Sequence, residues 1–160
     1  MEQGRLEEAI PHFENVLRMD PQDATSYANI GAELQKQGKP HDAIAAYQLA
    51  LLANPKPHLQ AGLYVNLWTI YTKLENFALA DQNFERALAL EPNLPAELIP
   101  TFLQSVNTHP TPQNFLQLGE LLQRSGSLTD ARAAYRRSLD IDPNFMQAKV
   151  MLAKIGATTK

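Results

Sequence analysis

One spacing occurs four times in this 160-residue chain: an alanine, an aromatic residue four positions later, and a proline eight positions after that. The instances are Ala9, Phe13, Pro21; Ala43, Tyr47, Pro55; Ala80, Phe84, Pro92; and Ala131, Tyr135, Pro143. Residues four apart share one face of a helix, and a proline disfavours helical geometry in the residue before it. The spacing therefore predicts a series of similar helices, each of which ends near a proline.

A second pattern precedes the last three instances. An aromatic residue is followed at helical spacing by an aliphatic residue, a small residue and another large apolar residue. The three copies are Tyr27, Ile30, Gly31, Leu34; Tyr64, Leu67, Trp68, Tyr71; and Phe115, Leu118, Gly119, Leu122. Apolar residues at this spacing form a stripe on one helix face. Each unit is thus predicted to be a pair of amphipathic helices.

The joined pattern resembles the tetratricopeptide repeat, whose signature is an aromatic residue, Leu, Gly and Tyr, followed by Ala, Phe and Pro. The resemblance runs along the whole chain. It implies an all-α fold, a right-handed solenoid of antiparallel helix pairs, in which the first helix of each pair lines the concave side. Helices are predicted at 4–18, 23–36, 40–53, 59–73, 77–90, 96–107, 112–124, 128–141 and 145–155.

The intervals between the prolines give the domain organisation. Pro21 to Pro55 is 34 residues, the usual repeat length, whereas the next two intervals are 37 and 51 residues. We expect one domain, 1–160, made of a half-repeat 1–22, repeats 23–56 and 57–92, an inserted helix and strap 93–111, a repeat 112–143 and a capping helix 144–157.

The longest interval contains an apolar set followed by helix-breaking residues 108–112. A single added helix would reverse the direction of the units after it. A helix of about 12 residues rises roughly 18 Å, and five or six extended residues cover about the same distance. We therefore expect a helix followed by an extended strap, with Pro100 either kinking that helix or starting its regular part.

Trp68 departs from the family pattern, because the matching positions hold Gly31 and Gly119. The three extra residues near 56–60 could let the helix shift while the indole fills the gap. In the alternative, which we favour, Trp68 packs against the inserted segment.

The two ends of the chain differ. Phe145, Ala148, Leu152 and Ile155 form one apolar stripe, as a terminal capping helix requires. The first motif, by contrast, starts as the second helix of a unit without its usual first helix. Either an upstream portion is missing, the alternative we favour, or another chain covers that face.

Composition excludes several classes of function. The net charge of −3 and the scattered basic residues do not suit nucleic acid. Without cysteine there is no disulfide or thiolate metal site, and the four histidines lack helical partners that would make a metal face. No apolar run is long enough to insert into a membrane, no signal peptide is visible, and no catalytic or cofactor motif is present. A cytoplasmic, non-enzymatic protein without a cofactor is the expectation.

Candidate binding residues lie opposite the apolar stripe of each first helix. At 100° per residue, the rows are Thr25, Asn29, Ala32, Lys36; Asn66, Thr69, Lys73; and Gln113, Gln117, Glu120, Arg124. Each row contains an amide and ends in a cation. By resemblance these rows would line the concave groove; the alternative is that such residues are simply common on solvated helix faces.

The amide column Asn29, Asn66 and Gln117 is similar to the asparagine ladder of O-linked N-acetylglucosamine transferase, which holds the backbone of an extended peptide. An amide offers both a donor and an acceptor, as a peptide unit does. The cation column would weakly favour an acidic stretch in the ligand. A carboxylate clamp of the chaperone-adaptor kind is not expected, because Ala28, Ala32, Gln113 and Gln117 depart from its residues and only Asn66 agrees.

Three functional hypotheses follow. The leading one is a scaffold that binds an extended peptide or partner protein in the groove. The second is an accessory, substrate-positioning region of a larger enzyme such as a glycosyltransferase. The third is self-association into a homo-oligomer through the helix expected at 4–18.

Overall fold

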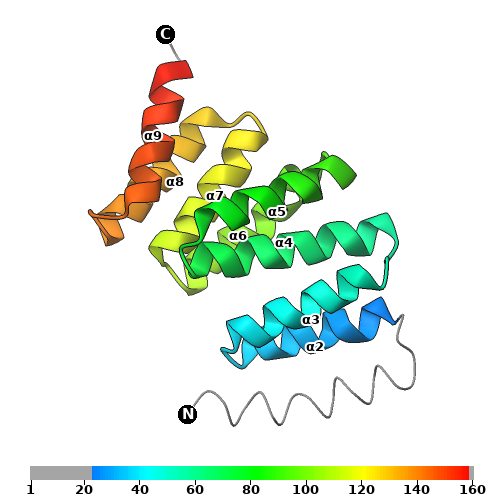
Figure 1. Ribbon diagram of the computed structural model, residues 1–160. Coiled ribbons are helices and arrows are strands. Elements are labelled where there is room, and N and C mark those ends of the chain that lie inside the picture. The colour runs from blue at the N-terminus through cyan, green and yellow to red at the C-terminus, as the bar shows by residue number, and fades with distance from the viewer. Residues whose placement is uncertain (1–22, 159–160) are drawn as a thin grey trace. The chain divides into compact units, whose positions relative to one another are not determined.

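The structure is a computed structural model that describes residues 23–158. Over this range it contains eight α-helices and no strand (Figure 1). The helices are α2 (Ala24–Lys36), α3 (Pro40–Leu52), α4 (Pro57–Lys73), α5 (Phe77–Leu90), α6 (Leu94–Thr108), α7 (Pro112–Arg124), α8 (Leu128–Ile141) and α9 (Met146–Thr158).

The all-helical prediction is confirmed, and these eight helices match the expected ones to within a few residues at each end. The periodicity succeeds because it recurs in every unit and because prolines delimit it. Pro40, Pro57 and Pro112 each begin a helix, where the missing N–H costs no hydrogen bond. The half-repeat 1–22 and its helix 4–18 lie outside the described residues.

The described chain forms two compact units. The N-terminal unit comprises residues 23–71 and 78–91, and the C-terminal unit comprises Thr72–Phe77 and residues 92–158. The turn that connects α4 to α5 therefore belongs to the C-terminal unit. Each unit has its own hydrophobic core.

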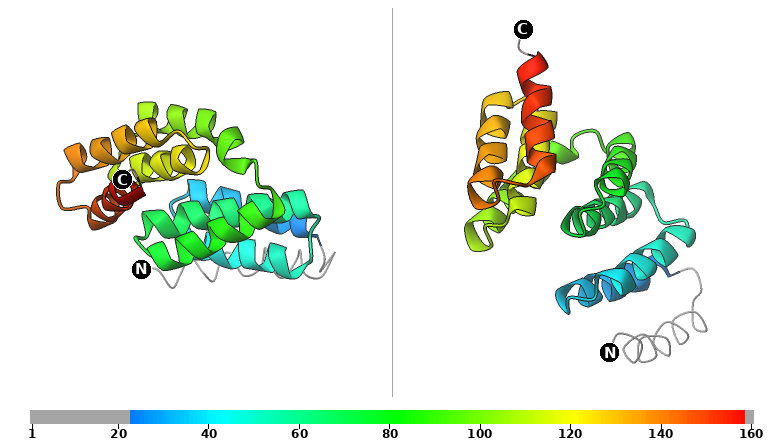
Figure 2. Two further views of the ribbon diagram at one scale, coloured as in Figure 1. Left: turned by 90° about the horizontal axis from the view of Figure 1, so that it is seen from above. Right: turned by 60° about the vertical axis from the view of Figure 1, so that its left-hand side comes forward.

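The core of the N-terminal unit joins α2, α3 and α4. Tyr27 and Leu34 of α2 pack in one cluster with Ala43 and Tyr47 of α3 and with Leu67 of α4. The right-hand view of Figure 2 shows α2 and α3 side by side, and the two helices pack against each other. Ala43 is completely buried, so a larger side chain would have no room between the paired helices.

A close approach of glycine and tyrosine holds the α2–α3 pair. A Cβ atom built on Gly31 would lie 2.5 Å from Cε1 of Tyr47, a distance that side chains do not tolerate. The Tyr47 hydroxyl donates a 3.1 Å hydrogen bond to Oε1 of Gln35 on α2. The tyrosine ring thus lies on the backbone of α2 at Gly31, and its hydroxyl is hydrogen-bonded to α2 one turn further along.

The α7–α8 pair repeats this arrangement. A Cβ on Gly119 would lie 2.4 Å from Cε1 of Tyr135, and the Tyr135 hydroxyl donates a 2.9 Å hydrogen bond to Oε1 of Gln123. Tyrosine and glutamine are twelve residues apart in both pairs. The first and third repeats therefore use the same contact between their helices.

In the α4–α5 pair, two stacked aromatic rings take the place of the glycine–tyrosine contact. Trp68 and Phe84 have ring centroids 4.4 Å apart and ring planes 18° apart, and Trp68 is completely buried. This geometry is the offset stack that aromatic pairs favour. The indole therefore packs within its own repeat, whereas its expected contact with the inserted segment would join the two units and stays a prediction.

The first helix of each repeat ends in a left-handed residue. Gly38 and Gly126 have φ values of 71° and 87°, and the matching residue of the middle repeat, Glu75, has a φ of 57°. Glycine adopts this conformation freely at the end of a helix, but a residue with a Cβ is strained there. The middle repeat thus keeps the same helix ending without the residue that suits it.

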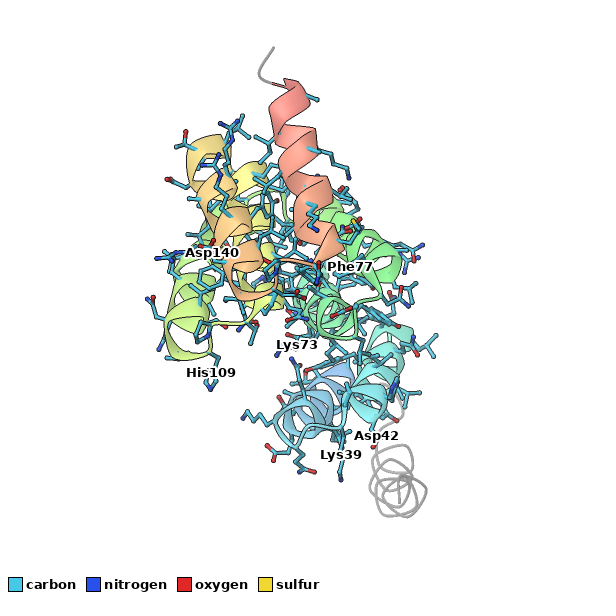
Figure 3. All side chains as sticks on the ribbon, turned by 90° about the vertical axis from the view of Figure 1, so that its left-hand side faces the viewer. Lys39, Asp42, Lys73, Phe77, His109 and Asp140 are labelled. Atoms are coloured by element: carbon cyan, nitrogen blue, oxygen red, sulfur yellow. The ribbon has the colours of Figure 1, made fainter. Side chains whose placement is uncertain are left out.

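The C-terminal unit is built around α7, which packs against both α6 and α8. Its core contains Leu116 of α7, Tyr135 of α8, and Phe145 and Ile155 near and within α9. Phe77 also packs there, with its ring centroid 5.8 Å from that of Phe145 (Figure 3). The apolar stripe expected in the last helix thus faces the core.

The expected extended strap is wrong. Only residues 109–111 separate α6 from α7, and the two helices pack against each other. Asn114 stabilises the turn. Its side chain donates a 2.7 Å hydrogen bond to the carbonyl of His109, and its backbone N–H donates a 3.1 Å hydrogen bond to the Thr111 hydroxyl. This local capping lets Pro112 begin α7 at once. Helix α6 also continues through Pro100, so its regular part does not start there.

Candidate functional site

The first expected row lies on the outer face of α2. Thr25, Asn29 and Lys36 are exposed and Ala32 is half-buried, whereas the stripe with Tyr27 is buried. The helix begins at a capping residue, Asp23, which accepts a 3.0 Å hydrogen bond from the Ser26 amide and another from the Ser26 hydroxyl. These bonds, that of the hydroxyl first, lower the pKa of Asp23. The cap fixes where the row starts.

The second row lies on α4 and is partly enclosed. Asn66 and Thr69 are half-buried, and Lys73 is exposed. The Thr69 hydroxyl donates to the carbonyl of Val65 at 3.1 Å, a bond within its own helix. Asn66 and Asn29 both belong to the N-terminal unit, in which α2 and α4 share one core. These two amides are therefore carried by helices that pack in the same unit.

The third row, on α7, does not form an open face. Gln117 is 0% exposed and Glu120 is 7% exposed, so the expectation that both line a solvent-accessible groove is wrong. Gln113 is half-buried and donates a 3.1 Å hydrogen bond to Oε1 of Glu75. Arg124, at the end of the helix, is exposed and is the most accessible of the four.

Gln117 and Glu120 are buried because several segments pack around α7. Helices α6 and α8 both pack against it, Gln113 donates a hydrogen bond to Glu75, and Phe77 packs against the core that contains Leu116. Six successive residues, 116–121, are buried, which is more than the 3.6 residues of one helical turn. Over residues 116–121 the helix is enclosed on all sides and has no solvent face for polar side chains.

The burial of Gln117 leaves its amide without partners. Neither Oε1 nor Nε2 makes a hydrogen bond within the described part of the chain. Its neighbour Asn114, one turn earlier and also buried, bonds the carbonyl of His109. An unpaired buried amide costs free energy of the order of 1 to 3 kcal/mol, so Gln117 is expected to lower the stability of the C-terminal unit.

The cation column has a structural role in addition to any binding role. Lys36, Lys73 and Arg124 are the last residues of α2, α4 and α7. A positive charge in the last turn interacts favourably with the partial negative charge at the carboxyl end of a helix. Lys36 also lies 4.0 Å from Glu33, with both side chains mostly exposed, so that ion pair contributes little.

The tyrosine–glutamine pairs were not expected from the sequence. Tyr47 is completely buried, and burial raises its pKa to about 12. The same effect raises the pKa of Tyr27. A signal was present in the sequence, because Gln35 and Gln123 both stand twelve residues before the tyrosine of their repeat. Gln35 and Gln123 accept the tyrosine hydrogen bonds, and both are half-buried.

Metal-binding and membrane-spanning features are not found between residues 23 and 158. This range contains no group of three or more His, Asp or Glu side chains arranged to hold a metal ion. No helix in it is both long and apolar enough to span a bilayer. His109, for example, lies on the outside of the turn between α6 and α7 (Figure 3), with Thr108 as its hydrogen-bond partner at 3.0 Å.

Comparison with known proteins adds sequence and structural matches. Two sequence profiles, each described as a tetratricopeptide repeat, match residues 1–67 and residues 61–94 and 112–145. Among solved structures, the chain is similar to the first TPR of Spaghetti (RPAP3) bound to the HSP90 peptide SRMEEVD, with 26% identity, 88% of this chain and 95% of that chain covered, and a TM-score of 0.45.

Two further solved structures are similar. MamA shares 20% identity over 99% of this chain and 81% of its own, with a TM-score of 0.48. YrrB, described as a TPR protein with an unusual peptide-binding site, shares 22% identity over 94% of this chain and 84% of its own, with a TM-score of 0.46.

Proposed function

This chain belongs to the tetratricopeptide repeat family, and from that premise we propose that it is a non-catalytic scaffold that binds an extended segment of a partner protein. The observation that carries the proposal is the pair Asn29 and Asn66. These amides occupy the same position in two successive repeats, on helices that share a core, and neither is fully buried.

The chemistry of an amide suits this role. Each Asn side chain has a carbonyl oxygen that accepts and an NH₂ group that donates, so it can pair with a peptide unit whatever the side chain attached to it. Packed helices lie about 8–10 Å apart, and an extended chain advances about 3.3 Å per residue. Two amides on neighbouring first helices would therefore contact peptide units about three residues apart.

The partner's side chains would be selected by charge. Lys36 and Lys73 are exposed and would favour acidic residues in the bound segment. Because these cations are exposed to solvent, each would contribute little and its contribution would fall as salt is added. Affinity would come mainly from the backbone contacts and from the apolar area that the ligand buries on the helices.

The proposal is tested with peptides selected from a random library displayed on phage and panned against the protein. A selected peptide is then titrated calorimetrically against the wild type and against the double variant Asn29→Ala, Asn66→Ala. Two lost hydrogen bonds predict a Kd weakened by about tenfold or more. The matched control is Gln48→Ala, which removes an exposed amide from α3 and should leave the Kd unchanged. Equal affinity for wild type and double variant would refute the amide contacts.

A further inference from the structure

The amide position of the three repeats shows a graded loss of exposure. Asn29 on α2 is exposed, Asn66 on α4 is half-buried, and Gln117 on α7 is completely buried. The sequence alone gives three equivalent positions, because the same motif surrounds each of them. In the structure, these three positions differ in their exposure to solvent.

The third position is closed by parts of the chain itself. Within the C-terminal unit, α7 contacts α6, α8 and the turn Thr72–Phe77. Of these, α6 is the segment that the other repeats lack, and the position of Glu75 is occupied by glycine in the first and third repeats. Helix α6 and Glu75, two of the features that enclose α7, therefore have no counterpart in the other repeats.

The residues around Gln117 are already engaged. Gln113, one turn before it, donates its side-chain hydrogen bond to Glu75, and Asn114 donates to the carbonyl of His109. The Gln117 amide itself has no solvent-accessible surface and no hydrogen-bond partner in the described residues. A ligand backbone could reach it only if the surrounding helices separated, and such a separation would expose the core around Leu116.

We infer that the third repeat takes no part in binding, and that an extended polypeptide is held by α2 and α4 alone. This inference rests on the proposed function and narrows it: the backbone of the ligand is bound at two points, Asn29 and Asn66. The bound segment is accordingly short, with a core of only a few residues. The third repeat instead supplies a closed helical unit whose first helix is buried over residues 116–121.

The test uses the peptide selected above and three single variants of the full chain: Asn29→Ala, Asn66→Ala and Gln117→Leu. The first two should each weaken the Kd by roughly two- to tenfold, whereas Gln117→Leu should leave it unchanged. Truncation of the peptide should retain full affinity until the residues that face α2 and α4 are removed.

A second measurement guards against a variant that fails to fold. Amide hydrogen exchange of the wild-type protein, with and without the selected peptide, should show added protection in α2 and α4 and an unchanged rate in α7. Faster exchange in α7 on binding, or a Kd that Gln117→Leu weakens as much as Asn29→Ala does, would overturn the inference. In that case the proposed function would stand, since all three amides would contribute. Insensitivity to all three variants would instead refute the amide contacts of the proposed function.

Discussion

Gly31 lies directly beneath the ring of Tyr47, so close that a single added methyl group would lie 2.5 Å from its Cε1 atom. The ring is completely buried and cannot swing away, because its hydroxyl is bonded to Gln35 on the same helix as the glycine. The glycine therefore serves helix packing, since the helix itself would be more stable with alanine.

The first prediction concerns that glycine. Gly31→Ala should destabilise the protein by about 1 to 3 kcal/mol, because the methyl group forces the buried ring and the two helices apart. Gly62→Ala is the matched control: Gly62 is an exposed helical glycine with no atom within 4 Å of the position that an added Cβ would take. It should stabilise the protein by about 0.5 to 1 kcal/mol. Urea unfolding measures both, and a similar sign for the two variants would contradict the packing argument.

The second prediction concerns the strained turn at Glu75. Its φ of 57° suits glycine, so Glu75→Gly should relieve about 1 kcal/mol of backbone strain. The variant also removes the hydrogen bond from Gln113, and a Gln113→Ala background cancels that loss from the comparison. As a control, Gly38→Ala at a φ of 71° with nothing near its methyl should lose about 1 kcal/mol. A Glu75→Gly variant that is less stable in the Gln113→Ala background would show that backbone strain does not govern the stability of this turn.

The third prediction concerns the unpaired amide of Gln117. Gln117→Leu should raise the free energy of unfolding by about 1 to 3 kcal/mol, because an apolar side chain of similar size needs no partner there. Gln123→Leu is the contrasting change, since Gln123 accepts the hydrogen bond of Tyr135 at 2.9 Å, and its loss should cost about 1 kcal/mol. Thermal and urea unfolding followed by circular dichroism distinguish the two, and destabilisation by Gln117→Leu would mean that its amide has a partner.

The fourth prediction is a loss of stability in alkali. The pKa of Tyr47 in the folded state, about 12, is above the ordinary value of 10.0, so the folded protein holds the phenolic proton more tightly than the unfolded chain does. The resulting stabilisation is complete below pH 10 and disappears as the pH rises from 10 to 12. The slope of stability against pH in this interval should be smaller in Tyr47→Phe than in the wild type. Identical slopes in the two proteins would assign the alkaline loss to other groups.

The fifth prediction uses Trp68, the only tryptophan of the chain. Trp68→Gly alone should cost about 3 to 5 kcal/mol because it leaves a large cavity beside Phe84. Adding Phe84→Tyr would rebuild the glycine–tyrosine contact of the other two repeats and should recover part of that loss. A double variant no more stable than Trp68→Gly would show that the middle pair of helices is spaced too widely for the smaller contact.

Much of the fold could be predicted from the sequence because the signals that define its helices are local. The apolar period, the prolines and the glycines that end helices act within a few residues, so the helices from α2 to α9 were expected close to where they lie. The short turn after α6 was missed for a related reason. Its length depends on a hydrogen bond from Asn114 to His109, which spacing arguments do not reveal.

The candidate site was only partly predictable. The position opposite the apolar stripe is exposed at Asn29 but enclosed at Gln117, although the same motif surrounds both. An amphipathic pattern identifies one buried face of a helix. It cannot show that further segments, here α6 and the turn Thr72–Phe77, cover the opposite face as well.

The stacked pair Trp68 and Phe84 also limits how this sequence can change over generations. Exchange of Trp68 for glycine alone would open a hole, whereas in the outer repeats exchange of the glycine for tryptophan alone would collide with a tyrosine. Replacement of Trp68 alone in the middle repeat, or of the glycine alone in the first or third repeat, thus gives a less stable protein. The two positions of each pair are therefore expected to change together rather than one at a time.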